Sequence, residues 1–169
     1  KPDRLVAVKS SQLEAVAFNQ TTIEFFTNTG AATGTFQSKG IVIETGCAST
    51  NGIVELDNSL MWLDNKGVFQ RMEGYGARPI STRVLERAIA DYDWSSAIAF
   101  VWEDRGHKVA YWTFRDGFTV GYDVTTGLWH RRQSYGMNRW RLSCLVNWNG
   151  RWIGGDFQTG KLYELYWDY

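Results

Sequence analysis

DVTTGLWH at residues 123–130 and DFQTGKLY at residues 156–163 share one pattern, Asp-x-x-Thr-Gly followed by a strand, at an offset of 33 residues. A weaker copy begins at Asp64. In each copy the Asp carboxylate can accept backbone N–H groups across the turn, and the Gly can adopt the left-handed conformation. We therefore expect Asp123 and Asp156 to occupy equivalent turns. Recurrence of one hairpin at about the size of a blade favours radial repetition, as in a β-propeller.

The rest of the sequence alternates between short apolar stretches and turn residues. Asp57-Asn58, Arg105-Gly106 and Asn149-Gly150 each separate two such stretches, and residue pairs of this kind accept the positive φ of tight hairpins. This spacing predicts an all-β fold, a β-propeller-like array of antiparallel blades. The array has about four units and is either a small closed propeller or part of a larger one. The expected units are residues 1–46, 47–95, 96–134 and 135–169 of a single domain or fragment.

One helix is expected, over residues 82–91. Ser81 and Thr82 supply a hydroxyl N-cap. An apolar stripe at helical spacing follows, which includes Val84, Leu85 and Ile89. We expect this helix to pack on the outside of a sheet.

The composition of the 169 residues limits the classes of function. Eighteen basic residues balance eighteen acidic ones, so no global field attracts nucleic acid or an anionic membrane. The nine Trp residues are expected mainly in the core between blades. Cys47 and Cys144 lie in apolar surroundings and are predicted to be buried free thiols. No apolar run reaches the length of a transmembrane helix.

Catalytic motifs are missing from the sequence. The two histidines, His107 and His130, have no evident partner, and neither a G-x-S-x-G motif nor a zinc-ligand spacing is present. Most turn aspartates are explained by backbone capping. No phosphate-binding loop is found, because Gly74-Tyr-Gly76 lacks the third glycine. We therefore expect no enzymatic activity, no metal and no cofactor.

A single cluster combines basic and aromatic residues. It contains Arg131, Arg132, Arg139 and Arg141 together with Trp140. These four arginines are the candidates for a weak contact with DNA or with an acidic partner. Because the net charge is zero, a solvated face or a protein–protein contact is the favoured interpretation.

A family resemblance rests on the order of short motifs over nearly the whole chain. These motifs include Gly46-Cys47-Ala48, Trp62-Leu63, Ile80-Ser81-Thr82, Thr126–Arg131 and Tyr163-Glu164-Leu165. In this respect the chain resembles the tail accessory proteins of short-tailed bacteriophages, also called packaged-DNA stabilisation proteins. Members of this family are longer than 169 residues, so we expect the chain to be part of a longer protein.

The resemblance implies a structural virion protein that acts as a head–tail connector. Such proteins are β-propeller-like and form a homo-oligomeric ring below the portal, where they extend the tail and help to retain packaged DNA. The implied partners are the portal, the tail tube, the needle and the tailspike, with DNA contact at most weak and no membrane. The implied location is the virion tail, after synthesis in the host bacterial cytoplasm. The family has no enzymatic residues to carry over.

Two alternative functions remain open at this point. The Trp content and the scattered Asp residues also suit a carbohydrate-binding or glycan-processing β-propeller. A third interpretation is a generic propeller scaffold for host proteins.

Overall fold

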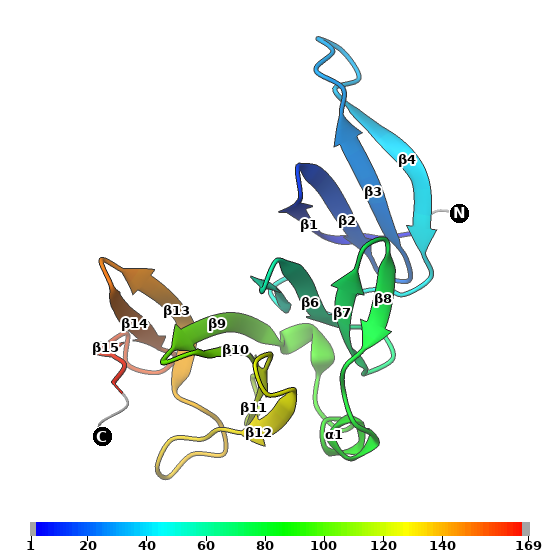
Figure 1. Ribbon diagram of the computed structural model, residues 1–169. Coiled ribbons are helices and arrows are strands. Elements are labelled where there is room, and N and C mark those ends of the chain that lie inside the picture. Colours follow the sequence, from blue (N-terminus) through cyan, green and yellow to red (C-terminus); the bar gives the residue numbers. More distant parts are fainter. Residues whose placement is uncertain (1–2, 167–169) are drawn as a thin grey trace.

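The computed structural model describes residues 3–166, which form four antiparallel sheets in succession along the chain (Figure 1). The first sheet contains β1 (Leu5–Ser11), β2 (Glu14–Asn19), β3 (Ile23–Asn28) and β4 (Phe36–Ile43). The second contains β5 (Ile53–Leu56), β6 (Ser59–Leu63), β7 (Phe69–Glu73) and β8 (Gly76–Pro79). The third contains β9 (Ile98–Asp104), β10 (His107–Phe114), β11 (Phe118–Asp123) and β12 (Leu128–Arg131). The fourth contains β13 (Leu142–Trp148), β14 (Arg151–Asp156) and β15 (Leu162–Glu164).

Strands that are consecutive in sequence are neighbours in every sheet, so each sheet is an antiparallel meander. This is the blade form that the hairpin spacing predicts, and the expected fold class is confirmed. Figure 1 shows the sheets as an open arc, with β1–β4 at one end and β13–β15 at the other.

The first hairpin of every sheet closes through the same kind of turn. Two residues with positive φ connect the first strand to the second, the backbone form that matches the right-handed twist of the flanking strands. These turns are Gln12-Leu13, Asp57-Asn58, Arg105-Gly106 and Asn149-Gly150. They are spaced 45, 48 and 44 residues apart (12 to 57, 57 to 105, 105 to 149). The blade period is therefore longer than the 33-residue offset of the sequence repeat.

Asp123 and Asp156 consequently do not occupy equivalent places, and that expectation is wrong. Asp123 ends the third strand of its sheet, whereas Asp156 ends the second strand of its own. Their local geometry is nevertheless alike, because each carboxylate accepts the N–H two residues further along, at 3.0 Å and 2.6 Å. The position equivalent to Asp156 in the second sheet is Asp64, which follows β6 and accepts N–H groups in the same way.

Consecutive sheets pack face to face, and apolar clusters fill the layers between them. We call the face that contacts the next sheet along the chain the front face, and the opposite one the back face. Large aromatic rings cross each layer and exclude water from it. The ring pairs are Phe18 with Trp62, Phe69 with Trp112, and Trp102 with Trp140.

The single α-helix of residues 3–166 is α1 (Arg83–Ala88), shorter than the expected 82–91. Thr82 caps it by accepting the N–H of Leu85, as predicted. Leu85 and Ile89 join the apolar cluster between the second and third sheets. Val84 is 80% exposed, so its place in the predicted apolar stripe is wrong. A helix this short turns only a narrow face toward the sheets.

The two cysteines differ in their surroundings. Cys47 is buried, and burial raises the pKa of its thiol to about 11. Cys144 is exposed, so the expectation that both are buried is wrong for this residue. It lies on the face of the fourth sheet that points away from the third sheet. Within residues 3–166, no helix is long and apolar enough to cross a bilayer.

The Asp123 turn generates a stability prediction. Replacing Asp123 by Ala removes an acceptor for backbone and side-chain donors. We expect the free energy of unfolding in urea to fall by about 1 kcal/mol at neutral pH. Burial raises the pKa of Asp123, but bonds from His107, Thr126 and Thr125 outweigh it and lower the pKa below 3.8. The charged form therefore stabilises the fold above about pH 4, and the difference from wild type should narrow as the pH falls below that value.

Asp116→Ala provides the control, because Asp116 is an exposed residue in a turn of the same sheet. Its effect should stay within about 0.5 kcal/mol. Equal losses for the Asp123 and Asp116 variants, or a loss that does not depend on pH, would contradict the prediction.

Candidate functional site

The four predicted arginines lie where the chain passes from the third sheet to the fourth. Arg131 ends β12, Arg132 and Arg139 belong to the connecting segment, and Arg141 immediately precedes β13. Arg132, Arg139 and Arg141 lie along the seam between the third and fourth sheets, whereas Arg131 packs on Phe118, a residue of the layer between the second and third sheets.

Arg132 lies in a cage of aromatic rings from the third sheet and the connecting segment. Its guanidinium carbon is 4.0 Å from the centre of the Trp140 ring and 4.7 Å from that of Trp102. It also donates to the Tyr111 hydroxyl at 3.0 Å. A guanidinium held over ring faces in this way gains cation–π attraction while one edge still forms a hydrogen bond. Arg132 thus holds the connecting segment against β9 and β10 of the third sheet.

Arg139 and Arg141 fix the connecting segment to the fourth sheet. Arg139 is buried over the Phe157 ring at 4.1 Å and donates to the backbone carbonyl of Arg115. Arg141 Nε lies 3.1 Å from a carboxylate oxygen of Asp156, whose side chain is fully buried. Hydrogen bonds and the Arg141 charge outweigh the effect of burial and lower the pKa of Asp156.

Arg131 is the exposed member of the group. It packs over the Phe118 ring at 4.9 Å and donates to the carbonyl of Asn138. The other three guanidinium groups are committed to contacts within the chain. The cluster is thus better described as an aromatic–arginine seam than as an open basic surface.

Tyr111 and His130 form the centre of this seam on the third sheet. Gly121 lies between them in the register, and a Cβ there would come within 2.5 Å of the Tyr111 ring. The glycine lets the Tyr111 hydroxyl approach His130 Nε2 to 3.1 Å. Burial, followed by the Arg132 charge, lowers the pKa of His130. Both effects favour the neutral imidazole, which acts as a hydrogen-bonding partner inside the seam.

The second histidine also has a partner, which the sequence did not reveal. His107 Nδ1 lies 2.7 Å from an Asp123 carboxylate oxygen, and the Thr126 hydroxyl donates to the same oxygen at 2.9 Å. The pairing arises because β10 and β11 bring positions 107 and 123 to one end of the third sheet. Its signal lay in the hairpin register and not in any local motif. These contacts stabilise the turn that follows β11.

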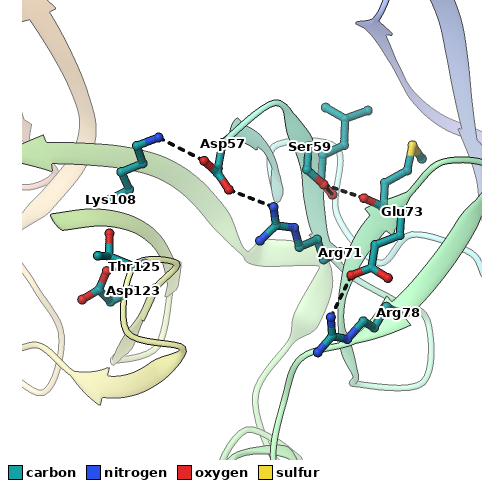
Figure 2. A network of polar contacts seen from close by, with 10 residues as sticks. Asp57, Ser59, Arg71, Glu73, Arg78, Lys108, Asp123 and Thr125 are labelled. Atoms are coloured by element: carbon teal, nitrogen blue, oxygen red, sulfur yellow. Dashed lines mark hydrogen bonds and ion pairs between the residues drawn. The ribbon is translucent and has the colours of Figure 1, made fainter. Parts of the chain in front are cut away.

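A polar network joins the second and third sheets near their first hairpin turns (Figure 2). Asp57, in the first turn of the second sheet, accepts from Lys108 of β10 and from Arg71 of β7, each at 3.0 Å. The bonds from Lys108 and then Arg71 lower the pKa of Asp57. Nearby, Arg78 pairs with Glu73 at 2.9 Å. Asp57 thus binds two cations, Arg71 from its own sheet and Lys108 from the third sheet, and Glu73 binds a further one.

Residues 1–168 match the family model described as the bacteriophage P22 Gp10 stabilisation protein, a β-propeller. The chain belongs to this family. It is therefore a phage structural protein, and the predicted resemblance is confirmed. The search of curated proteins gave no significant match.

Two solved structures are similar to this member of the phage stabilisation family at low sequence identity. The computationally designed Ika4 protein is 13% identical with a TM-score of 0.49, over 98% of this chain and 92% of its own. BamB from Moraxella catarrhalis is 15% identical with a TM-score of 0.42, over 94% of this chain and 50% of its own. The chain thus spans about half the length of BamB.

The seam generates a second stability prediction. Replacing Arg132 by Ala should lower the free energy of unfolding by about 1–2 kcal/mol, because it removes the ring contacts and the bond to Tyr111. Arg132→Lys should recover only part of the loss, since an ammonium lacks the planar surface that stacks on Trp140. Urea unfolding followed by Trp fluorescence measures both variants.

Arg131→Ala is the matched control, because Arg131 is a neighbouring but exposed arginine. We expect a change of no more than about 0.5 kcal/mol. If the Arg131 and Arg132 variants lose the same stability, the aromatic cage does not stabilise the seam.

Proposed function

We propose that the chain is part of a phage tail protein that assembles below the portal, extends the tail and retains packaged DNA. The single observation that carries the proposal is the family match over residues 1–168. On this proposal the parent protein forms a homo-oligomeric ring and contacts the portal, the tail tube, the needle and the tailspike. Its place in the particle is the virion tail.

The charge distribution supports retention of DNA by closure of the channel and not by tight binding. The net charge is zero. Arg132, Arg139 and Arg141 are held by ring faces, carbonyls and a carboxylate of the same chain. A protein that grips duplex DNA needs several free cations facing the phosphates. A ring that narrows the exit needs only a rigid wall, which stacked sheets supply.

We further propose that the chain has no enzymatic activity. His107 is bound to Asp123 in a turn, and His130 is bound to Tyr111 inside the seam. Within residues 3–166, no cluster of His, Cys, Asp or Glu is arranged to hold a metal ion. The polar side chains of these networks are used to join strands and sheets.

The carbohydrate-binding alternative has less support. A sugar platform needs exposed aromatic faces, but Trp62, Trp102, Trp112 and Trp140 are all buried between sheets. Trp148 is 70% exposed. Trp167, another candidate, lies outside the described residues. A glycan array remains the direct test of this alternative.

Binding at physiological salt separates the proposed function from nucleic-acid binding. The parent protein should be retained by the portal assembly of its own phage at about 0.15 M salt, because apolar and main-chain contacts are screened little. DNA binding by the chain should be weak. Even if all four arginines touched phosphates, the log–log salt slope would be about −3.6. Pull-down and fluorescence titration measure the two affinities.

Arg131→Ala is the informative variant for the DNA titration, since Arg131 is the exposed arginine. It should reduce any salt slope by about 0.9 and leave portal binding unchanged. Nanomolar DNA affinity at this salt without portal binding would contradict the proposed function.

A further inference from the structure

One hydroxyl group lies at the centre of the seam. It belongs to Tyr111 of β10, which lies on the front face of the third sheet and is 1% exposed. A hydroxyl buried in this way depends on hydrogen bonds to its neighbours. Arg132 donates to the hydroxyl oxygen at 3.0 Å, and His130 Nε2 lies 3.1 Å from the same oxygen. Side chains from β10, β12 and the connecting segment thus meet at one buried atom.

The bonding around this oxygen determines the state of His130. A guanidinium can only donate, so Arg132 occupies a lone pair of the oxygen. Burial raises the pKa of Tyr111, which keeps the hydroxyl protonated. The hydroxyl proton is then available to His130 Nε2, which accepts it when the imidazole is neutral and carries its own proton on Nδ1. In this state all three groups are bonded.

A proton on His130 Nε2 reverses the arrangement. The imidazolium and the guanidinium then both direct donors at one oxygen, and the Tyr111 proton loses its acceptor. Loss of a partner is costly for a buried hydroxyl. The two cations also face the same atom, from 3.1 Å and 3.0 Å, so they repel each other. Because His130 is accessible to solvent, the proton reaches it without unfolding of the chain.

Two charged groups act on the His130 ring. Burial opposes its protonation most strongly, and the Arg132 charge opposes it next. The Asp123 carboxylate, at the end of β11, favours protonation, but it is already bonded to His107 and Thr126. Burial and Arg132 prevail, so the pKa of His130 lies below 6.5. Neutral His130 therefore stabilises the seam fully above about pH 6.5, and this contribution is lost as the pH falls from 6.5 toward the lowered pKa.

The connecting segment is attached to the third sheet through Arg132 and Trp140. The Arg132 N–H donates to the Thr119 carbonyl at 3.0 Å, and the Trp140 N–H donates to the Thr119 hydroxyl at 2.9 Å. The Trp140 ring packs on Tyr111 with 4.9 Å between ring centres, and its centre lies 4.0 Å from the Arg132 guanidinium carbon. The two side chains that meet at the shared hydroxyl therefore also hold Trp140 in place.

We propose that the seam is a pH-sensitive contact, which holds the connecting segment on the third sheet at neutral pH and releases it in acid. The proton binds His130, the Tyr111 hydroxyl loses its acceptor, and Arg132 is repelled from its place beside the hydroxyl. The inference does not depend on the proposed role in the tail. The pKa values of Asp123 and Asp156 are lowered from 3.8, so these carboxylates stay charged above about pH 4 and do not cause the release.

Hydrogen exchange of single amides between about pH 7.5 and 4.5 tests the proposal on the full chain. The reporters are the N–H groups of Arg132 and Trp140, with each rate divided by the intrinsic rate at the same pH. A released segment leaves His130 with its ordinary pKa of about 6.5. The corrected exchange should therefore rise about tenfold for each pH unit by which the pKa measured for folded His130 lies below 6.5. The Ala48 N–H, bonded to the Leu63 carbonyl at 3.0 Å, should not change.

Matched variants separate the titration of His130 from a general loss of structure. His130→Gln keeps an acceptor for the hydroxyl but takes up no proton, so the corrected exchange should not depend on pH. His107→Gln is the control, because it removes the other histidine of the same sheet and should leave the pH dependence in place.

The charge at position 132 provides a second, spectroscopic readout. Titration of the His130 ring signals by NMR should show a higher pKa in Arg132→Gln, which lacks the charge, and a pKa close to that of wild type in Arg132→Lys, which keeps it. Near-UV circular dichroism checks that each variant is folded. If the Arg132 variants do not fold, the comparison of His130→Gln with His107→Gln decides the question.

Three results would overturn the proposal. One is a pKa of 6.5 or above for His130 in the folded chain. Another is a pH-dependent rise in exchange that persists in His130→Gln. The third is an equal rise at Ala48, which would indicate unfolding of the whole chain and not release of the connecting segment.

Discussion

Face-to-face packing of aromatic sheets is the interaction on which the rest of this structure depends. Trp62 and Trp112 are fully buried in successive layers, and loss of such a ring from a core costs about 3–5 kcal/mol. Each indole N–H also donates to a linker carbonyl, Trp62 to Gly46 and Trp112 to Gly52. Each side chain therefore fills a layer between sheets and also holds the segment that links β4 to β5.

The turns could be predicted well from the sequence. Which turns occupy equivalent places in different sheets could not. Two-residue turns such as Asn149-Gly150 are encoded by residues that tolerate positive φ, and so they were found. The Asp-x-x-Thr-Gly repeat was also a true turn, but a turn motif does not record which strands it joins. β8 has no clear strand signal in the sequence, because Ala77 to Pro79 carry few apolar residues and only an edge strand accommodates Pro in this way. The His107–Asp123 pair depends on strand register, which no local motif reports.

The polar contacts form a second system that links the same neighbours. Tyr75, beside β8, donates to Glu14 of the first sheet, and Asp57 of the second accepts from Lys108 of the third. In the layer between the third and fourth sheets, Arg132 packs over the ring face of Trp140. Several charged groups thus meet opposite charges or π systems across sheet boundaries. The composition already indicates the balance of positive and negative charge. Which charged residues contact each other can be known only from the fold.

The order of the sheets along the chain has a consequence for synthesis on the ribosome. Each sheet is complete within one uninterrupted stretch, and its contacts are mainly with the stretch before and after it. Contacts of low sequence separation form quickly and do not wait for the C-terminus. A nascent chain can therefore add one finished sheet at a time. Until the following sheet emerges from the ribosome, the apolar face that it will cover is exposed to water. The growing polypeptide is then most prone to aggregate or to bind a chaperone.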